Sequence, residues 1–173
     1  MAFADASLAR LRKLLDLPES HRIVLAQGGA SAQFGLVPLN FRRGNESPIY
    51  AAEGHWGRKA LAEARKLGPC RDLPRAELRD VQADYVHVTS NETIEGLQWH
   101  RPPETRALKV CDMSSDIAWA PVDLGAYDLV YASAQKNLGI AGLTLLLLSP
   151  RVRYALRSSR GFEMVFQSLR SLS

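Results

Sequence analysis

Short apolar runs bounded by polar or turn-forming residues recur along most of the chain. Their lengths and their content of Val, Ile, Leu and Tyr are typical of buried strands rather than helices. We therefore expect strands at residues 22–26, 49–52, 85–89, 108–111, 129–132 and 143–148. The charged, proline-containing connection at residues 71–84 shows no such run, and we assign no strand to it.

Three other segments repeat their apolar side chains at the helical period. Residues 6–17 place several leucines on one face and predict the first helix. The second helix begins after the turn at residues 28–31, and Pro38 is expected to kink or cut it. The third spans residues 56–67. Strands that alternate with helices or long connections predict an α/β domain with a mostly parallel sheet.

Composition and charge narrow the class of protein further. A hydrophobic fraction of 46% and a charged fraction of 23% are ordinary for a soluble globular domain. The longest apolar run, residues 143–148, is too short to span a bilayer, and the start of the chain does not resemble a secretory signal, so we expect a cytoplasmic protein. The net charge of +4 is weak support for nucleic acid binding. Cys70 and Cys111 stand alone, and no metal site is expected.

A lysine and an aspartate follow two of the predicted strands. Asp112 comes directly after residues 108–111, and Lys136 lies shortly after residues 129–132. A lysine held there in a dry pocket would have a lowered pKa and a nucleophilic amine. A lysine for a Schiff base and an aspartate that keeps a ring nitrogen protonated are what a pyridoxal phosphate (PLP) site requires. Taken alone, Lys136 is better explained as a solvated surface lysine.

Other strand ends offer groups for the same cofactor. The turn at residues 28–31 leads into a helix, whose free N–H groups suit a phosphate, although many such turns are only turns. Trp56 fits a core anchor or a ring that stacks on a cofactor. Thr93 lies in a polar segment that fits a turn with a helix cap, and its hydroxyl could instead contact the cofactor.

Longer motifs resemble the phosphoserine aminotransferases, a family of PLP enzymes with the aspartate aminotransferase fold (fold type I). They occur in that family's order along residues 8–149. The motifs are Gly28-Gly29-Ala30-Ser31-Ala32-Gln33-Phe34, Val37-Pro38-Leu39-Asn40, Gly54-His55-Trp56, Tyr85-Val86-His87, Asn91-Glu92-Thr93-Ile94-Glu95-Gly96, Asp112-Met113-Ser114-Ser115 and Tyr131 through Thr144.

The resemblance implies a domain organisation. Residues 1–150 would form a partial PLP-binding large domain of an α/β protein with a mostly parallel sheet, truncated and without the small domain. Residues 151–173 would be a divergent tail rich in arginine and serine. The connection between Gly68 and Tyr85 is shorter than in the family, which implies that one strand is lost there.

The resemblance also assigns roles to residues. Lys136 would carry PLP and move a proton between the substrate and the cofactor, while Asp112 would pair with the ring nitrogen. Trp56 would stack on the pyridine ring, and Thr93 would contact the cofactor. The cofactor phosphate would be held by Ala30, Ser31 and Gln135.

The family's reaction passes an amino group from glutamate to 3-phosphohydroxypyruvate and gives phosphoserine and 2-oxoglutarate in serine biosynthesis. A homodimer is implied, because a neighbouring subunit normally completes the phosphate site. Two other hypotheses stay open. The chain could be a catalytically inactive fragment or truncated paralogue that keeps a partial PLP pocket or a dimerisation surface. It could also be an aminotransferase of the same fold type with another acceptor.

Overall fold

A computed structural model of the chain describes residues 2–139 and 141–153. Its helices are α1 (Ala2–Leu14), α2 (Ala30–Phe41) and α3 (His55–Arg65), with 3₁₀ turns at Arg75–Glu77 and Leu124–Ala126. Its strands are β1 (Arg22–Gln27), β2 (Ile49–Ala51), β3 (Arg71–Asp72), β4 (Tyr85–Thr89), β5 (Asn91–Glu92), β6 (Leu97–Gln98), β7 (Leu108–Asp112), β8 (Leu129–Ser133) and β9 (Leu143–Leu148).

Seven of these strands form one sheet in the order β1-β9-β8-β7-β4-β2-β3. The pairs from β8 to β3 are parallel, while β9 runs antiparallel to both β8 and β1. The carboxyl ends of β1, β2, β4, β7 and β8 therefore lie along one edge of the sheet. This arrangement confirms the predicted α/β class with a mostly parallel sheet.

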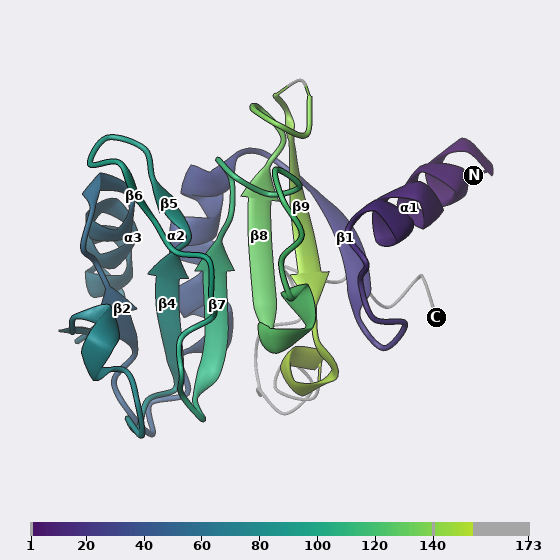
Figure 1. Cartoon of the computed structure of the whole chain (residues 1–173). Coiled ribbons are helices and arrows are strands. Elements are labelled where there is room, and N and C mark those ends of the chain that lie inside the picture. Colours follow the sequence, from purple (N-terminus) through teal and green to yellow (C-terminus); the bar gives the residue numbers. More distant parts are fainter. Residues whose placement is uncertain (1, 140, 154–173) are drawn as a thin grey trace.

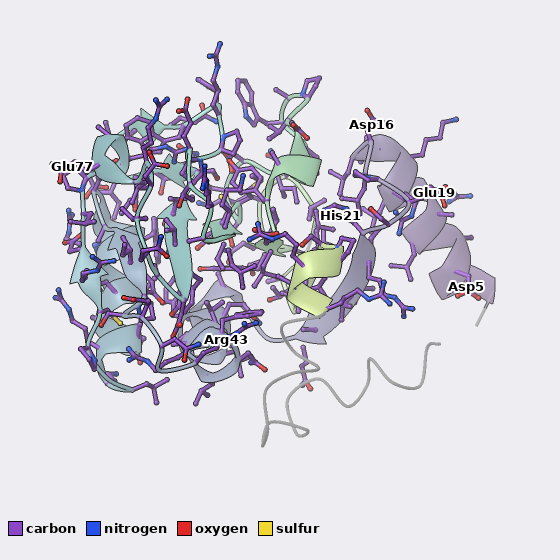
Figure 2. All side chains as sticks on the ribbon, turned by 90° about the horizontal axis from the view of Figure 1, so that it is seen from below. Asp5, Asp16, Glu19, His21, Arg43 and Glu77 are labelled. Atoms are coloured by element: carbon purple, nitrogen blue, oxygen red, sulfur yellow. The ribbon has the colours of Figure 1, made fainter. Side chains whose placement is uncertain are left out.

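The sheet has an apolar core on each face. Helices α2 and α3 cover one face, where Phe34, Leu61 and Val110 pack together. The loops between strands cover the other face, and Leu78, Ile117 and Leu124 are buried there. Figure 1 shows α2 and α3 behind the sheet, and Figure 2 shows α1 with Asp5 beyond the β1 end of the molecule. Both faces of the central strands are thus buried, as parallel sheets require.

The first two helices differ from their predicted bounds. Helix α1 ends at Leu14 rather than at residue 17, because Asp16 takes a left-handed φ of 45° and turns the chain. Leu15 and Leu17 are buried in that turn, so their apolar character reflects core packing rather than a longer helix. Helix α2 continues through Pro38 to Phe41, and the prediction that Pro38 would cut it was wrong.

Two short pairings were not anticipated. Residues 71–84, to which no strand was assigned, do contain one, because β3 pairs with β2. The two residues of β3 are Arg71 and Asp72, and both are exposed, so no apolar pattern marks them. The segment after β4 is a β5–β6 hairpin rather than a helix cap, and Glu92 pairs with Leu97 across it.

The boundary predicted at residue 150 is only partly covered by the structure. Most of the segment 151–173 lies outside the described residues. Within the described part, the Arg151 guanidinium donates to the buried Asp128 carboxylate (3.0 Å). No described helix is long and apolar enough to cross a membrane, and no cluster of potential metal ligands occurs among the described residues.

Candidate functional site

Asp112 and the loop that bears Lys136 lie on neighbouring strands at the carboxyl edge of the sheet. Asp112 is the last residue of β7 and pairs in register with Tyr131 of β8. The backbone N–H of Ser133, the last residue of β8, donates to Ser114 Oγ (3.0 Å) and so ties the two strand ends together. Lys136 follows three residues later. The structure therefore brings Asp112 and the Lys136 loop to one edge, as predicted.

The Asp112 carboxyl group is buried, with 5% of its surface exposed. Burial raises its pKa to about 6, because the charged form loses its hydration, and the nearby Glu92 charge acts in the same direction. The Ser114 backbone N–H donates to Asp112 Oδ1 (2.9 Å). This hydrogen bond and the nearby Tyr131 side chain lower the pKa of Asp112 and favour the anion that a protonated ring nitrogen needs as a partner.

The N-terminus of α2 is open to a ligand. Gly28 has a φ of +101°, which suits glycine, and its carbonyl accepts a hydrogen bond from Thr144 Oγ1 (3.0 Å). Within the described chain, no hydrogen bond uses the backbone N–H groups of Ala30 and Ser31, and Gly29 supplies no side-chain cap. A Cβ on Gly29 would lie 3.7 Å from the Ser133 hydroxyl, so this helix end lies beside the end of β8.

The N-terminus of α3 is closed by a buried carboxylate. Glu92 is 1% exposed, and its two oxygens accept hydrogen bonds from the backbone N–H groups of Trp56 (2.8 Å) and Gly57 (2.7 Å). A Cβ on Gly54 would lie 2.3 Å from the Glu92 side chain, so glycine at this position leaves room for the carboxylate. The Trp56 indole N–H donates to Thr93 Oγ1 (3.1 Å). The predicted pair Trp56 and Thr93 is thus brought together.

Lys136 and Gln135 are both exposed. The described residues therefore do not form the dry pocket that was expected around Lys136. Both residues lie beyond the end of β8 and belong to neither apolar core. Within the described chain, the Lys136 amine has no ion-pair partner. To be shielded from water, this amine would need a covering group that the described residues do not supply.

Three residues of this site had no predicted role. Glu92 holds the α3 turn that bears Trp56, while Tyr131 and His87 lie beneath Asp112 and hydrogen-bond to each other (2.8 Å). Gly54 and Gly57, on either side of Trp56, indicate that another group packs closely against the start of this helix. The sequence does not show which side chain that is. His87 and Tyr131 alternate with apolar residues in β4 and β8, and they look like ordinary core positions in the sequence.

The residues present fit PLP. The open α2 N-terminus suits its phosphate, and the buried Asp112 carboxyl group suits its pyridine nitrogen. The unpaired Lys136 amine suits its aldehyde, and the Trp56 ring offers an aromatic face.

A mostly parallel α/β sheet with these groups at its carboxyl edge defines the class as the large domain of the aspartate aminotransferase fold. The family model for class V aminotransferases matches residues 4–168. The chain belongs to the class V aminotransferase family.

Named relatives agree with this family. The phosphoserine aminotransferase of Laribacter hongkongensis is 42% identical over 81% of this chain and 43% of its own length. The phosphoserine aminotransferase of Shouchella clausii is 43% identical over 82% of this chain and 42% of its own length. The solved phosphoserine aminotransferase of Bacillus circulans subsp. alkalophilus superposes with a TM-score of 0.81 and 39% identity, over 87% of this chain and 46% of that one. The chain thus spans less than half the length of these relatives.

Proposed function

We propose that this chain is the cofactor-binding portion of a phosphoserine aminotransferase. The observation that carries the proposal is the placement of Asp112 and the Lys136 loop on the neighbouring strands β7 and β8, next to the uncapped N-terminus of α2. The names of the relatives support the choice of reaction within the family.

Each proposed residue has one task. PLP, when bound, supplies the electron sink that stabilises a carbanion at the substrate Cα. Lys136 binds the cofactor aldehyde and moves the proton at the substrate Cα, and Asp112 holds the proton on the ring nitrogen. Trp56 stacks on the ring, with Thr93 on its indole N–H. The phosphate is held by Ala30, Ser31 and Gln135.

The substrates and the assembly are part of the same proposal. Glutamate would donate the amino group and 3-phosphohydroxypyruvate would accept it, in the cytoplasmic synthesis of serine. A homodimer would complete the site, and the exposure of Ser31, Gln135 and Lys136 supports a second subunit at this edge.

Covalent trapping tests the cofactor part of this proposal. The purified chain is mixed with PLP, reduced with borohydride and mapped by peptide mass spectrometry. We expect the label on Lys136, and we expect K136A to lose it. The control variant K66A removes an exposed lysine at the other end of α3, which pairs with Glu63, and should keep the label on Lys136. An unlabelled wild-type chain would refute PLP binding. Formation of phosphoserine from glutamate and 3-phosphohydroxypyruvate then tests the reaction.

The exposed Lys136 amine also supports the second candidate, a chain that binds PLP without catalysis. Labelled Lys136 without amino transfer would favour this inactive form. Amino transfer from glutamate to another 2-oxo acid, but not to 3-phosphohydroxypyruvate, would favour an aminotransferase with a different acceptor.

A further inference from the structure

The loop that bears Lys136 is anchored on both sides of the lysine. Before Lys136, the backbone N–H of Ser133 donates to Ser114 Oγ (3.0 Å). After it, the side-chain amide of Asn137 donates to the backbone carbonyl of Ile117 (3.2 Å). None of the roles proposed above involves Asn137, so its hydrogen bond to a turn twenty residues earlier in the chain needs its own explanation.

Both acceptors belong to one turn, residues 113–117, which directly follows Asp112. The turn is closed by the Ile117 N–H, which donates to the Met113 carbonyl (3.0 Å). Its Ser114 N–H donates to Asp112 Oδ1 (2.9 Å), so the same turn also holds the carboxylate. The orientation of Asp112 and the course of the Lys136 loop are therefore set by the same five residues.

The two anchors are not equally replaceable. The N–H of Ala134, next to Ser133, donates to the Leu143 carbonyl (2.8 Å), so β9 also holds the chain before the lysine. After the lysine, Asn137 is assisted by Leu138, which packs against the apolar core that contains Ile117. Asn137 itself is exposed, so its truncation removes the hydrogen bond without opening a cavity in the core. Asn137 is therefore the more informative residue to change.

We propose that Ser114 and Asn137 are positioning residues for Lys136. They hold the backbone of its loop to the turn that follows Asp112, so that the amine and the carboxylate approach a ligand from fixed places on neighbouring strands. A group held in place before binding loses less conformational entropy when it bonds to a ligand. The inference rests on the proposed function only for the ligand, because the hydrogen bonds are properties of this chain.

The motion of the loop without cofactor is the first test. Nitrogen-15 relaxation gives an order parameter for the backbone N–H of Lys136. We expect a value of about 0.85 in the wild-type chain, as for rigid backbone, and a value below about 0.6 in N137A. Equal order parameters in the two chains would overturn the proposal.

Binding of two ligands is the second test. The probes are PLP and pyridoxamine phosphate, which share the ring nitrogen and the phosphate. PLP can bond to Lys136 through its aldehyde, with loss of water, whereas pyridoxamine phosphate carries an amine at that carbon and cannot. We expect N137A to weaken PLP roughly fivefold, as for one lost hydrogen bond, and to leave pyridoxamine phosphate unchanged. Equal weakening of both ligands would show a merely structural role and overturn the proposal.

A double-mutant cycle shows whether Asn137 acts through the lysine. In K136A neither ligand can form the bond, so adding N137A should not change PLP affinity further. A fivefold loss that persists in the K136A background would overturn the proposal. The matched control is S115A, which removes a hydrogen bond of the same length (3.2 Å) from the same turn to the Asn91 carbonyl. It should leave the ratio of the PLP and pyridoxamine phosphate affinities unchanged, and a fivefold change in that ratio would overturn the proposal.

Failure of the proposed function gives a different result. A wild-type chain that binds neither PLP nor pyridoxamine phosphate would refute cofactor binding. The relaxation measurement would still decide whether Asn137 holds the Lys136 loop, because it uses the chain without any ligand.

Discussion

Truncation of Glu92 to alanine should destabilise the fold strongly, although Glu92 is not a proposed cofactor contact. The carboxylate is 1% exposed and is the acceptor for the backbone N–H groups of Trp56 and Gly57, at 2.8 and 2.7 Å. The alanine variant leaves these two donors at the start of α3 without a partner and opens a cavity. The first turn of any helix has no internal acceptors, so no other backbone group replaces the lost carboxylate.

The size of the effect follows from these contacts. Hydrogen bonds to a charged group contribute roughly 1.5–3 kcal/mol each, and a carboxylate near a helix N-terminus adds about 0.3–1 kcal/mol. The two bonds share one carboxylate and are not fully additive, so we expect a loss of about 3–5 kcal/mol for E92A. For a chain of this length, each kcal/mol shifts the melting temperature by roughly 2–4 °C. The melting temperature should therefore fall by roughly 6–20 °C.

Thermal and urea unfolding, followed by circular dichroism, measure this loss. E92Q keeps one acceptor oxygen and should fall between wild type and E92A. The matched control is E95Q in the same hairpin, because Glu95 pairs with the exposed Arg58 and its loss should leave the melting temperature unchanged. An E92A variant within about 1 kcal/mol of wild type would refute the reasoning, because a buried acceptor of two backbone donors cannot be lost at so small a cost.

The remaining predictions concern the same region and its pH dependence. G54A should destabilise by about 1–3 kcal/mol, because its Cβ would overlap Glu92, whereas G35A, with open space in α2, should stabilise by up to about 1 kcal/mol in the same urea assay. Because the folded pKa of His87 is about 3, the unfolded chain binds the extra proton, and stability should fall as the pH drops from 6.5 toward 3; H87Q should reduce this slope. Asp112 has the opposite effect on stability. Its folded pKa of about 6 lies above its usual value of 3.8, so its contribution to folding stability is present below pH 3.8 and is lost as the pH rises through 6. D112N should therefore gain about 2.4 kcal/mol relative to wild type between pH 4 and pH 7 in urea unfolding, and a pH-independent difference would contradict this.

The long strands of the sheet could be predicted because their apolar runs report burial on both faces. Both ends of β4 agree with the prediction. Strands β7 and β8 each extend one residue beyond their predicted ends, to Asp112 and Ser133. These two polar residues end the runs that the pattern detects, yet they continue the ladder at the edge where the site lies. Strand β3 could not be found in this way, because its pairing to β2 uses the backbone of two exposed residues.

The placement of two candidate site residues was predictable from residue type and strand order. A lysine and an aspartate after successive strands of a parallel sheet must reach the same edge, and Asp112 and Lys136 do. The contacts of Glu92 and Tyr131 depend instead on side chains that meet across the fold. A sequence pattern gives their burial but not their partners, so the carboxylate that closes α3 and the hydroxyl beneath Asp112 became visible only in three dimensions.

The two helices that start at this edge explain where an anion would bind. Both α2 and α3 begin after a glycine, and both point the positive end of the helix dipole toward the edge that bears Asp112. At α3 the Glu92 carboxylate already occupies the backbone donors, so a phosphate would meet a like charge there. At α2 the N–H groups of Ala30 and Ser31 remain available within the described chain, beside the end of β8. Of the two helix ends, α2 is therefore the one suited to a cofactor phosphate, and in the proposed site α3 would hold the Trp56 ring.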